Sequence, residues 1–332
     1  MSNLESQFKE FLHNIEPDEK AVKYAQKAHE PLREYLSSDK EFAGFFIDSF
    51  LYGSYRRQTA VGDIKDVDIV ILTNFSEEDK PNNALQKLKS ALARYYEDPE
   101  NPEYQRRSIR VNDPLPGTDT EMTLDVIPAI LMTDDESPLK VPDREVGEWI
   151  WSHPKGHMKH TSDLNKDNFS EGRFVPLVKI VRWWWKHQCE VNQPEVERPK
   201  PKGFWLECLT AENFDTTKHD YADHFIALLQ NVYSKYKDEK SVPELDDPGL
   251  INEKIKSSMT NEEFAKFIKI LKTSLELATN AANTVDDAES SEKWQEVLGP
   301  KFPIIKKTTE TNDMKKNGPT IITHPPKQHY NA

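Results

Sequence analysis

Three aspartates and a Gly-Ser pair are the residues of this chain whose types and spacing suit chemistry on a phosphate. Gly53 and Ser54 open the segment GSYRRQTAVGDIKDVD, which closes with Asp66 and Asp68, and Asp125 stands further on in TLDVIPAI. Magnesium prefers hard oxygen ligands and keeps part of its coordination shell for substrate phosphates. Carboxylates at this spacing therefore indicate a metal-dependent reaction on a phosphate-bearing substrate.

Two predicted strands must position these carboxylates. The runs DVDIVIL and TEMTLDVIPAILM are β-branched, largely apolar and of strand length. Side chains at i and i+2 of a strand share a face, so Asp66 and Asp68 lie side by side. If the two strands are neighbours in one sheet, Asp125 joins them. Three carboxylates at that range repel one another and raise one another's pKa, and a bound dication resolves the conflict.

The Gly-Ser pair ends a third predicted strand, FAGFFIDSFLY. Gly53 lets the backbone turn tightly against a ligand, and Ser54 offers its hydroxyl and its amide to a phosphate. The chain contains neither GxxxxGK[ST] nor GxGxxG. The phosphates are therefore expected to be held without a P-loop or a Rossmann turn.

The order Gly-Ser, short gap, Asp-x-Asp and distal Asp resembles that of the polymerase-β type nucleotidyltransferases. Within that superfamily the chain is similar to the cyclic GMP-AMP synthase and DncV-like enzymes (CD-NTases), which are relatives of oligoadenylate synthase. Their GSY-x-R-x-T-x-V element stands here as GSYRRQTAV, with Gln58 where many relatives carry Gly, and their D-V-x-P-A element stands as DVIPA.

A second block, VPLVKIVRWWWKHQ followed by KPKGFWLECLTAE, resembles the helical half of the same family. The resemblance implies that Arg182 takes the place of a triphosphate-contacting lysine and that Phe204 takes the place of an aromatic residue that stacks on a base. Lys202 and Gly203 stand where relatives carry small polar residues. Gly203 removes a phosphate-facing hydroxyl, and Lys202 with Arg182 is expected to neutralise the donor triphosphate.

The resemblance also implies an α+β fold. A polymerase-β-like nucleotidyltransferase lobe, with a mixed sheet, helices and an N-terminal helix, is expected over residues 1–170, and a helical nucleotide-binding lobe over 171–307. The active site is expected in the cleft between them. Residues 308–332 predict a flexible C-terminal tail, because they lack the apolar residues needed to offset the cost of ordering.

The activity implied is the Mg²⁺-dependent condensation of nucleoside triphosphates into a cyclic or linear oligonucleotide second messenger, with release of pyrophosphate. Of two ions, with Mn²⁺ as an alternative to Mg²⁺, one is assigned to all three aspartates and the other to Asp66 and Asp68. Asp125 is the candidate to receive the acceptor's proton. The implied setting is bacterial antiphage signalling, with a downstream effector that binds the product and a ubiquitin-transfer-like regulator acting at Ala332.

Composition limits the partners. The net charge is −13 and the pI about 5.3, whereas proteins that grip long nucleic acids usually present a basic face. Basic residues gather only locally, in the last thirty residues and at Arg56, Arg57, Arg106, Arg107 and Arg110. Small nucleotides are therefore the expected anionic ligands, and a solvated or salt-bridged surface is the other interpretation of these arginines. The chain has no apolar run near the roughly 20 residues that a membrane span requires and no signal-peptide pattern at its start, so a cytoplasmic protein without a membrane partner is expected.

Elsewhere the pattern predicts a helix within the first 37 residues, interrupted at Pro31, and an amphipathic helix after Pro81. The strands are expected to end near residue 132, and residues 133–170 to cross between the lobes. Two of the three tryptophans at 183–185 are expected in the core. Further helices are predicted at about 174–190, 204–214, 218–236, 261–285 and 287–298.

Two other activities stay open at this point. A tRNA- or poly(A)-type terminal transferase would use the same aspartates, although the charge of −13 disfavours a nucleic-acid channel. A catalytically inactive nucleotidyltransferase fold could serve as a binding module, although the intact set of carboxylates argues against it. The bases used, the linkage and the size of the product are not determined by these motifs.

Overall fold

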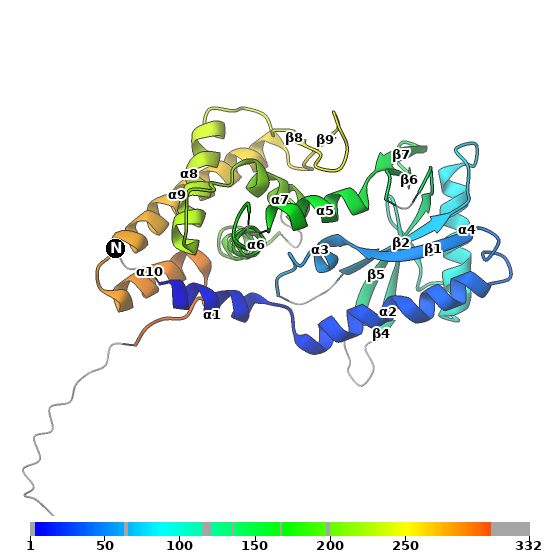
Figure 1. Cartoon of the computed structure of the whole chain (residues 1–332), viewed down its shortest axis with the longest axis horizontal. Coiled ribbons are helices and arrows are strands. Elements are labelled where there is room, and N and C mark those ends of the chain that lie inside the picture. The colour runs from blue at the N-terminus through cyan, green and yellow to red at the C-terminus, as the bar shows by residue number, and fades with distance from the viewer. Residues whose placement is uncertain are drawn as a thin grey trace, which may run out of the picture.

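The computed structural model describes residues 4–62, 66–114, 121–134, 136–166, 168–196 and 200–306. Figure 1 shows two lobes side by side: a sheet with α2 and α4 on the right, here called the sheet lobe, and a group of helices on the left, here called the helical lobe. Helix α5 (Pro154–Leu164) lies between them. The predicted tail, including Ala332, falls outside the described residues.

The sheet is mixed and has the strand order β1-β2-β5-β4-β3, with the β6–β7 hairpin attached to β5. The β2–β5 pair is parallel, and the other pairs are antiparallel. The strands are β1 (Phe46–Tyr52), β2 (Asp66–Thr73), β3 (Glu103–Tyr104), β4 (Ile109–Pro114), β5 (Glu121–Ile130), β6 (Leu139–Asp143) and β7 (Glu148–Ser152).

Strand β2 is buried on both faces, which fixes its position in the sheet. Val67, Ile69 and Ile71 pack in one hydrophobic cluster with side chains of α2 (Glu19–Ser38) and α4 (Pro81–Tyr95). The alternate residues of β2 pack in a second cluster with β5 and β6. A one-residue slip would exchange the two faces and turn Asp66 and Asp68 toward the apolar cluster of α2 and α4, so the register is strongly specified.

The helical lobe has an aromatic core. Trp184 and Trp185 of α6 are buried, as predicted for two of the three tryptophans. Helix α9 begins with a capping box, in which Thr260 and Glu263 satisfy each other's backbone amides. The helices are α1 (Glu5–Ile15), α6 (Phe174–Asn192), α7 (Gly203–Glu212), α8 (Tyr221–Tyr236), α9 (Asn261–Asn283) and α10 (Asp287–Leu298), beside a short hairpin of β8 (Leu245–Asp246) and β9 (Lys254–Ile255).

The first helix packs with the helical lobe although the next elements of the chain build the sheet. The Phe8 ring contacts Trp294 at 4.9 Å and Phe302 at 5.1 Å between centroids, and Phe11 belongs to the same core. The chain then runs under the molecule to α2 in the sheet lobe (Figure 1). The domain limits at 170 and 307 stay predictions.

Two local predictions were wrong. Helix α2 continues through Pro31, because Ala25, Leu32 and Leu36 on either side of it are buried in the core of the sheet lobe and this packing outweighs the lost backbone hydrogen bond. The strands do not end near residue 132, because residues 133–170 contain the β6–β7 hairpin before α5, the helix that lies between the lobes. Pro142 within β6 and the single register pair between Ile130 of β5 and Lys140 of β6 explain why the local pattern was weak.

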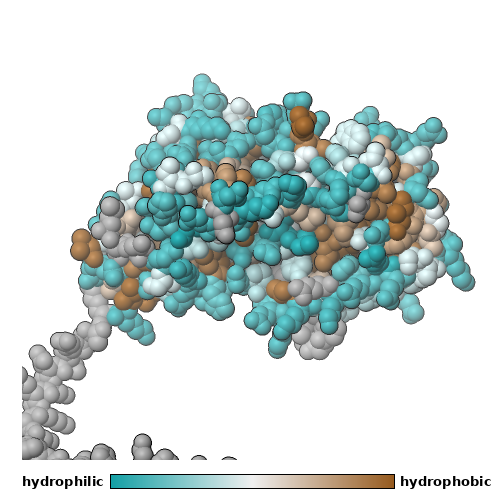
Figure 2. Space-filling model, viewed as in Figure 1, coloured by the Kyte–Doolittle hydropathy of each residue, from teal (hydrophilic) through white to brown (hydrophobic). Residues whose placement is uncertain are grey.

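The surface is mostly polar. Figure 2 shows hydrophilic residues over most of one face, with smaller hydrophobic patches. No helix within the described ranges is both long enough and apolar enough to cross a membrane.

Candidate active site

The parallel pairing of β2 with β5 brings the predicted aspartates together. Asp68 is the register partner of Asp125, and Asp66 is the partner of Thr123. The prediction that the two strands are neighbours is therefore confirmed. Asp66, at the first residue of β2, keeps 57% of its side chain exposed, whereas the Asp125 side chain is 14% exposed. The carboxylates lie at the point where buried strands meet solvent.

Gly53 is required by its contact with Asp68. Its φ is +80°, and a Cβ built on it would lie 1.9 Å from Asp68 Oδ2. Any other residue would be strained in backbone conformation and would clash with the carboxylate. Gly53 and Ser54 begin the short helix α3 (Gly53–Arg56), directly after Tyr52, which is the register partner of Asp68 on β1. The predicted Gly-Ser turn thus lies against β2, the strand that carries Asp66 and Asp68.

The grouping is electrostatically unfavourable for Asp68. The pKa of Asp68 is raised to about 6, mainly by burial and then by the negative charges of Asp125 and Asp66, while Arg57 and Arg110 act in the opposite direction. Like charges in a poorly solvated position disfavour the ionised form. Asp68 therefore carries a cost that a nearby cation would relieve.

Arg110 supplies such a cation to Asp125. Its Nε donates to Asp125 Oδ1 at 3.1 Å and its Nη2 to Oδ2 at 2.7 Å, and Nη2 also lies 4.0 Å from Asp66 Oδ1. Among the residues that the structure describes, no three His, Cys, Asp or Glu side chains are grouped so as to hold a metal ion. The assignment of one ion to all three carboxylates stays a prediction, and in this structure the Arg110 guanidinium pairs with Asp125. The donors themselves, carboxylates on adjacent strand positions, fit a hard dication.

Arg57 and Glu207 form a buried ion pair between the lobes. Arg57 Nε donates to Glu207 Oε1 at 2.9 Å and Nη2 donates to Oε2 at 3.2 Å, with side chains 3% and 4% exposed. Glu207 also accepts from the hydroxyls of Thr59 at 3.1 Å and Thr161 at 2.7 Å. Arg182 joins this group, because its Nη1 donates to Thr59 Oγ1 at 3.1 Å. We call the five residues the interlobe cluster: Arg57, Thr59, Thr161, Glu207 and Arg182. The interlobe cluster joins the segment after α3 to helices α5, α6 and α7.

The sequence had predicted a surface position for Arg57, and that prediction was wrong. Arg57 and Thr59 belong to the GSYRRQT element, and Glu207 to GFWLE of the second block. The sequence therefore held a signal for this ion pair, because the two elements that resemble the family contain an arginine and a glutamate. Their pairing across 150 positions could not be read from either element alone.

Arg182 lies inside this cluster, and Gly203 makes room for it. A Cβ on Gly203 would lie 2.7 Å from Arg182 Cζ. The Arg182 guanidinium thus occupies the space that a side chain at position 203 would need. Burial lowers the pKa of Arg182 to about 10, and Arg57 adds to this effect while Glu207 opposes it. Within the described part of the chain, Arg182 has no carboxylate at ion-pair distance.

Phe204 and Lys202 lie at the start of α7. The Phe204 ring centre lies 4.8 Å from Arg57 Cζ and 4.8 Å from the His157 ring centre. Lys202 is the exposed residue that precedes the helix. The structure thus brings Phe204 close to the Gly-Ser turn through Arg57. Among the described residues, no hydrogen bond or ion pair joins Lys202 to the three aspartates.

A second connection between the lobes runs through His157. Tyr52 Oη and His157 Nδ1 are 2.8 Å apart, and His157 Nε2 lies 2.8 Å from Asp247 Oδ1. Asp247 follows β8 in the helical lobe, and Tyr52 precedes Gly53. The residue before the Gly-Ser turn is therefore held from the far lobe.

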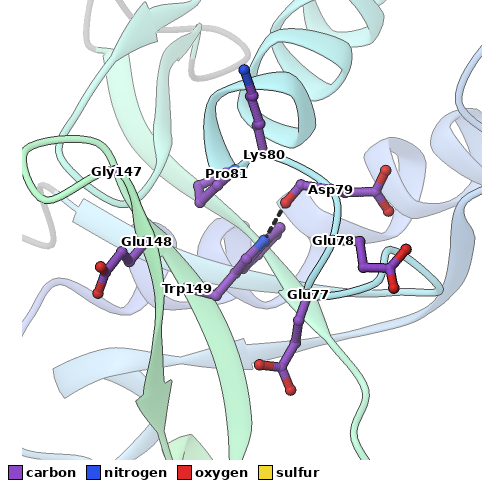
Figure 3. Close-up of a pocket in the computed structure, with 8 residues that line it drawn as sticks. All are labelled: Glu77, Glu78, Asp79, Lys80, Pro81, Gly147, Glu148 and Trp149. Atoms are coloured by element: carbon purple, nitrogen blue, oxygen red, sulfur yellow. Dashed lines mark hydrogen bonds between the residues drawn. The ribbon is translucent and has the colours of Figure 1, made fainter.

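One surface pocket lies elsewhere. It has a volume of about 360 Å³ and is formed by the residues before α4 and by the β6–β7 hairpin. Trp149 stands in its wall, with Nε1 donating to the carbonyl of Asp79 at 2.6 Å (Figure 3). The site residues discussed above do not line this pocket.

Comparison with known proteins gives the same assignment as the geometry. Residues 1–165 match the Second Messenger Oligonucleotide or Dinucleotide Synthetase domain. The chain is 34% identical over 311 residues to a cyclic AMP-AMP-AMP synthase of an Acinetobacter strain, covering 90% of this chain and 85% of that protein. It is 27% identical over 363 residues to a cyclic AMP-AMP-GMP synthase of Enterobacter hormaechei, covering 91% and 92%.

The fold is shared with solved structures. E. coli MS115-1 CdnC with ATP matches with a TM-score of 0.71 at 15% identity, over 90% of this chain and 98% of that one. The same protein, solved in complex with HORMA-deltaN, also gives a TM-score of 0.71. The α+β fold predicted from the sequence is confirmed.

We expect Asp68→Asn to raise the stability of the metal-free protein at neutral pH. The folded-state pKa of about 6 lies above the unfolded value, so the folded state loses stability as the pH rises from about 4 through 6 and carries the full penalty above that. The gain at pH 7.5 should be on the order of 1 kcal/mol. It should vanish near pH 4. Chemical denaturation with a chelator present measures it, and Asp66→Asn, at a more exposed position, should gain less. A less stable Asp68→Asn protein at pH 7.5 would contradict the electrostatic argument.

We expect Glu207→Gln to destabilise the fold by about 3–5 kcal/mol, because it leaves the Arg57 charge buried without its partner. The matched control is Glu212→Gln on the same helix, whose partner Lys235 at 3.1 Å is half exposed. That change should cost at most about 1 kcal/mol. Thermal or urea unfolding compares the two, and equal losses would show that the buried pair has no special role.

Proposed function

The chain belongs to the CD-NTase family and is a nucleotidyltransferase that makes cyclic oligonucleotides, and from this premise we propose that its product is a cyclic trinucleotide containing at least two adenylate units. Both relatives described above carry names with three nucleotides, of which all three are AMP in one name and two are AMP in the other. They align with about nine-tenths of this chain, so the likeness includes the helical lobe. ATP is accordingly the proposed main substrate.

The observation that carries the assignment of the site is the register of β2 and β5, which sets Asp68 beside Asp125 and against Gly53. We assign Asp66, Asp68 and Asp125 to the acceptor-side metal, and Asp66 and Asp68 to the second one. When bound, Mg²⁺, or Mn²⁺ in its place, would lower the pKa of the acceptor hydroxyl and neutralise charge on the triphosphate. Asp125 is the residue that we propose to receive the acceptor's proton.

The donor triphosphate is assigned to the side of the site formed by Arg182. This guanidinium lies beside Thr59 at 3.1 Å, and its lowered pKa marks a charge that burial has left under-compensated. An anionic phosphate would supply the missing counter-charge. Ser54 would donate to the same triphosphate, Lys202 would add charge from the rim, and Phe204 would offer its ring to a base.

The biological setting is proposed from the family. Antiphage signalling requires a downstream effector that binds the cyclic product. The complex of E. coli CdnC with HORMA-deltaN supports a protein regulator for the present enzyme as well. A ubiquitin-transfer-like regulator acting at Ala332 stays a prediction of the sequence.

Product analysis tests the proposal. The full chain is incubated with Mg²⁺ and with each nucleoside triphosphate alone and in pairs, then treated with phosphatase and examined by mass spectrometry. We expect a phosphatase-resistant trinucleotide whenever ATP is present, because a closed ring has no terminal phosphate. Asp66→Ala and Asp68→Ala should remain folded and form none. A dinucleotide or a linear product would overturn the trinucleotide, and extension of added RNA would favour a terminal transferase.

We expect Arg182→Ala to raise the apparent KM for ATP about ten- to a hundredfold, since a charge-assisted hydrogen bond contributes roughly 1.5–3 kcal/mol. Lys179→Ala is the matched control, because Lys179 lies one turn earlier in α6 and pairs with Glu16 at 2.8 Å. Steady-state kinetics on folded protein distinguishes the two. An unchanged KM in Arg182→Ala would remove this residue from the triphosphate site.

A further inference from the structure

Five residues form one row across the sheet. Reading from register partner to register partner, Tyr52 of β1 faces Asp68 of β2, which faces Asp125 of β5, which faces Arg110 of β4, which faces Glu103 of β3. Register partners project on the same face of a sheet within reach of each other. Arg110 therefore stands between two carboxylates: a candidate metal ligand on one side and Glu103 on the other.

In this structure Arg110 is paired with the metal-ligand side. Both Asp125 oxygens accept from its guanidinium, at 3.1 and 2.7 Å, and its Nη2 is 4.0 Å from the nearest Asp66 oxygen. One guanidinium nitrogen thus lies on the side of Asp125 that faces Asp66. A dication bridging Asp125 and Asp66 would need the same region and would be repelled by the fixed positive charge.

We propose that Arg110 is an internal counter-ion that occupies Asp125 in the metal-free enzyme and moves to Glu103 when the divalent metal binds. This inference rests on the proposed assignment of the metal to the aspartates. Arg110 compensates the repulsion among the carboxylates while no metal is present. Its side chain is 23% exposed, so it can leave Asp125 without unpacking the core. It is a positioning residue, acting on the reaction through Asp125.

The neighbouring arginines do not share this role. Arg106 and Arg107 both pair with Asp143, at 2.8 and 3.2 Å. Arg107→Met is therefore a matched control for Arg110→Met, since it removes the same charge from a nearby position and leaves Asp143 paired with Arg106. Any effect of overall charge should appear equally in both variants.

The first experiment titrates Mn²⁺ into the full chain without nucleotide and measures binding by electron paramagnetic resonance. Arg110→Met should bind Mn²⁺ at least about fivefold more tightly than the unaltered chain, as expected for loss of a competing ligand. Arg107→Met should stay within about twofold. Glu103→Gln should weaken binding, because the displaced guanidinium loses its second partner. Unchanged or weaker Mn²⁺ binding by Arg110→Met would overturn the proposal. Arg110 would then be a residue that holds the carboxylates in position and does not compete with the metal.

A second experiment needs no folded Met variant. In the unaltered chain labelled with ¹⁵N-arginine, the Arg110 Nε–H resonance, assigned with Arg110→Lys, should be protected from exchange without metal and should shift on addition of Mg²⁺. A resonance that stays unchanged at saturating Mg²⁺ would overturn the exchange of partners. Failure of the proposed function would look different, because the unaltered chain would then neither bind Mn²⁺ nor form the cyclic product.

Discussion

Repulsion among carboxylates at the start of two paired strands is the constraint on which the rest of this structure depends. The parallel register of β2 and β5 places Asp68 beside Asp125. Burial and the charge of Asp125 raise the pKa of Asp68 to about 6. Such a grouping persists only where the surrounding structure fixes it. Here β2 is buried on both faces, so the register cannot shift to separate the charges.

Positive charge is distributed around this grouping in two ways. Arg110 contacts Asp125 directly and remains partly exposed. Arg57 acts on Asp68 through space, while its hydrogen bonds go to Glu207 of the helical lobe. The second cation is fixed, because Glu207 accepts from three side chains in a buried position. The buried pair joins the two lobes, whereas the proposed exchange of partners concerns only the partly exposed Arg110.

The helical lobe also shapes the site through sterics. Gly203 leaves the space that Arg182 fills, and Gly53 leaves the space that the Asp68 carboxylate fills. In both places a glycine is needed because a charged group of another element approaches its backbone. Arg182 and Gly203 are therefore matched in this chain, because a side chain at 203 would meet the Arg182 guanidinium.

The sequence by itself determined the two carboxylate strands, the Gly-Ser turn and most helices of the second half, because their spacing of apolar residues and turn residues is local. The same rules failed at Pro31 and in β6–β7, where burial and pairing with distant residues outweighed local preference. Only the tertiary structure decided the partners of the arginines. Glu207 lies 150 positions from Arg57 and Asp125 lies 15 from Arg110, and each contact arises from the packing of separate elements. Local periodicity specifies which face a side chain takes, whereas the charge that it meets there is set by the fold.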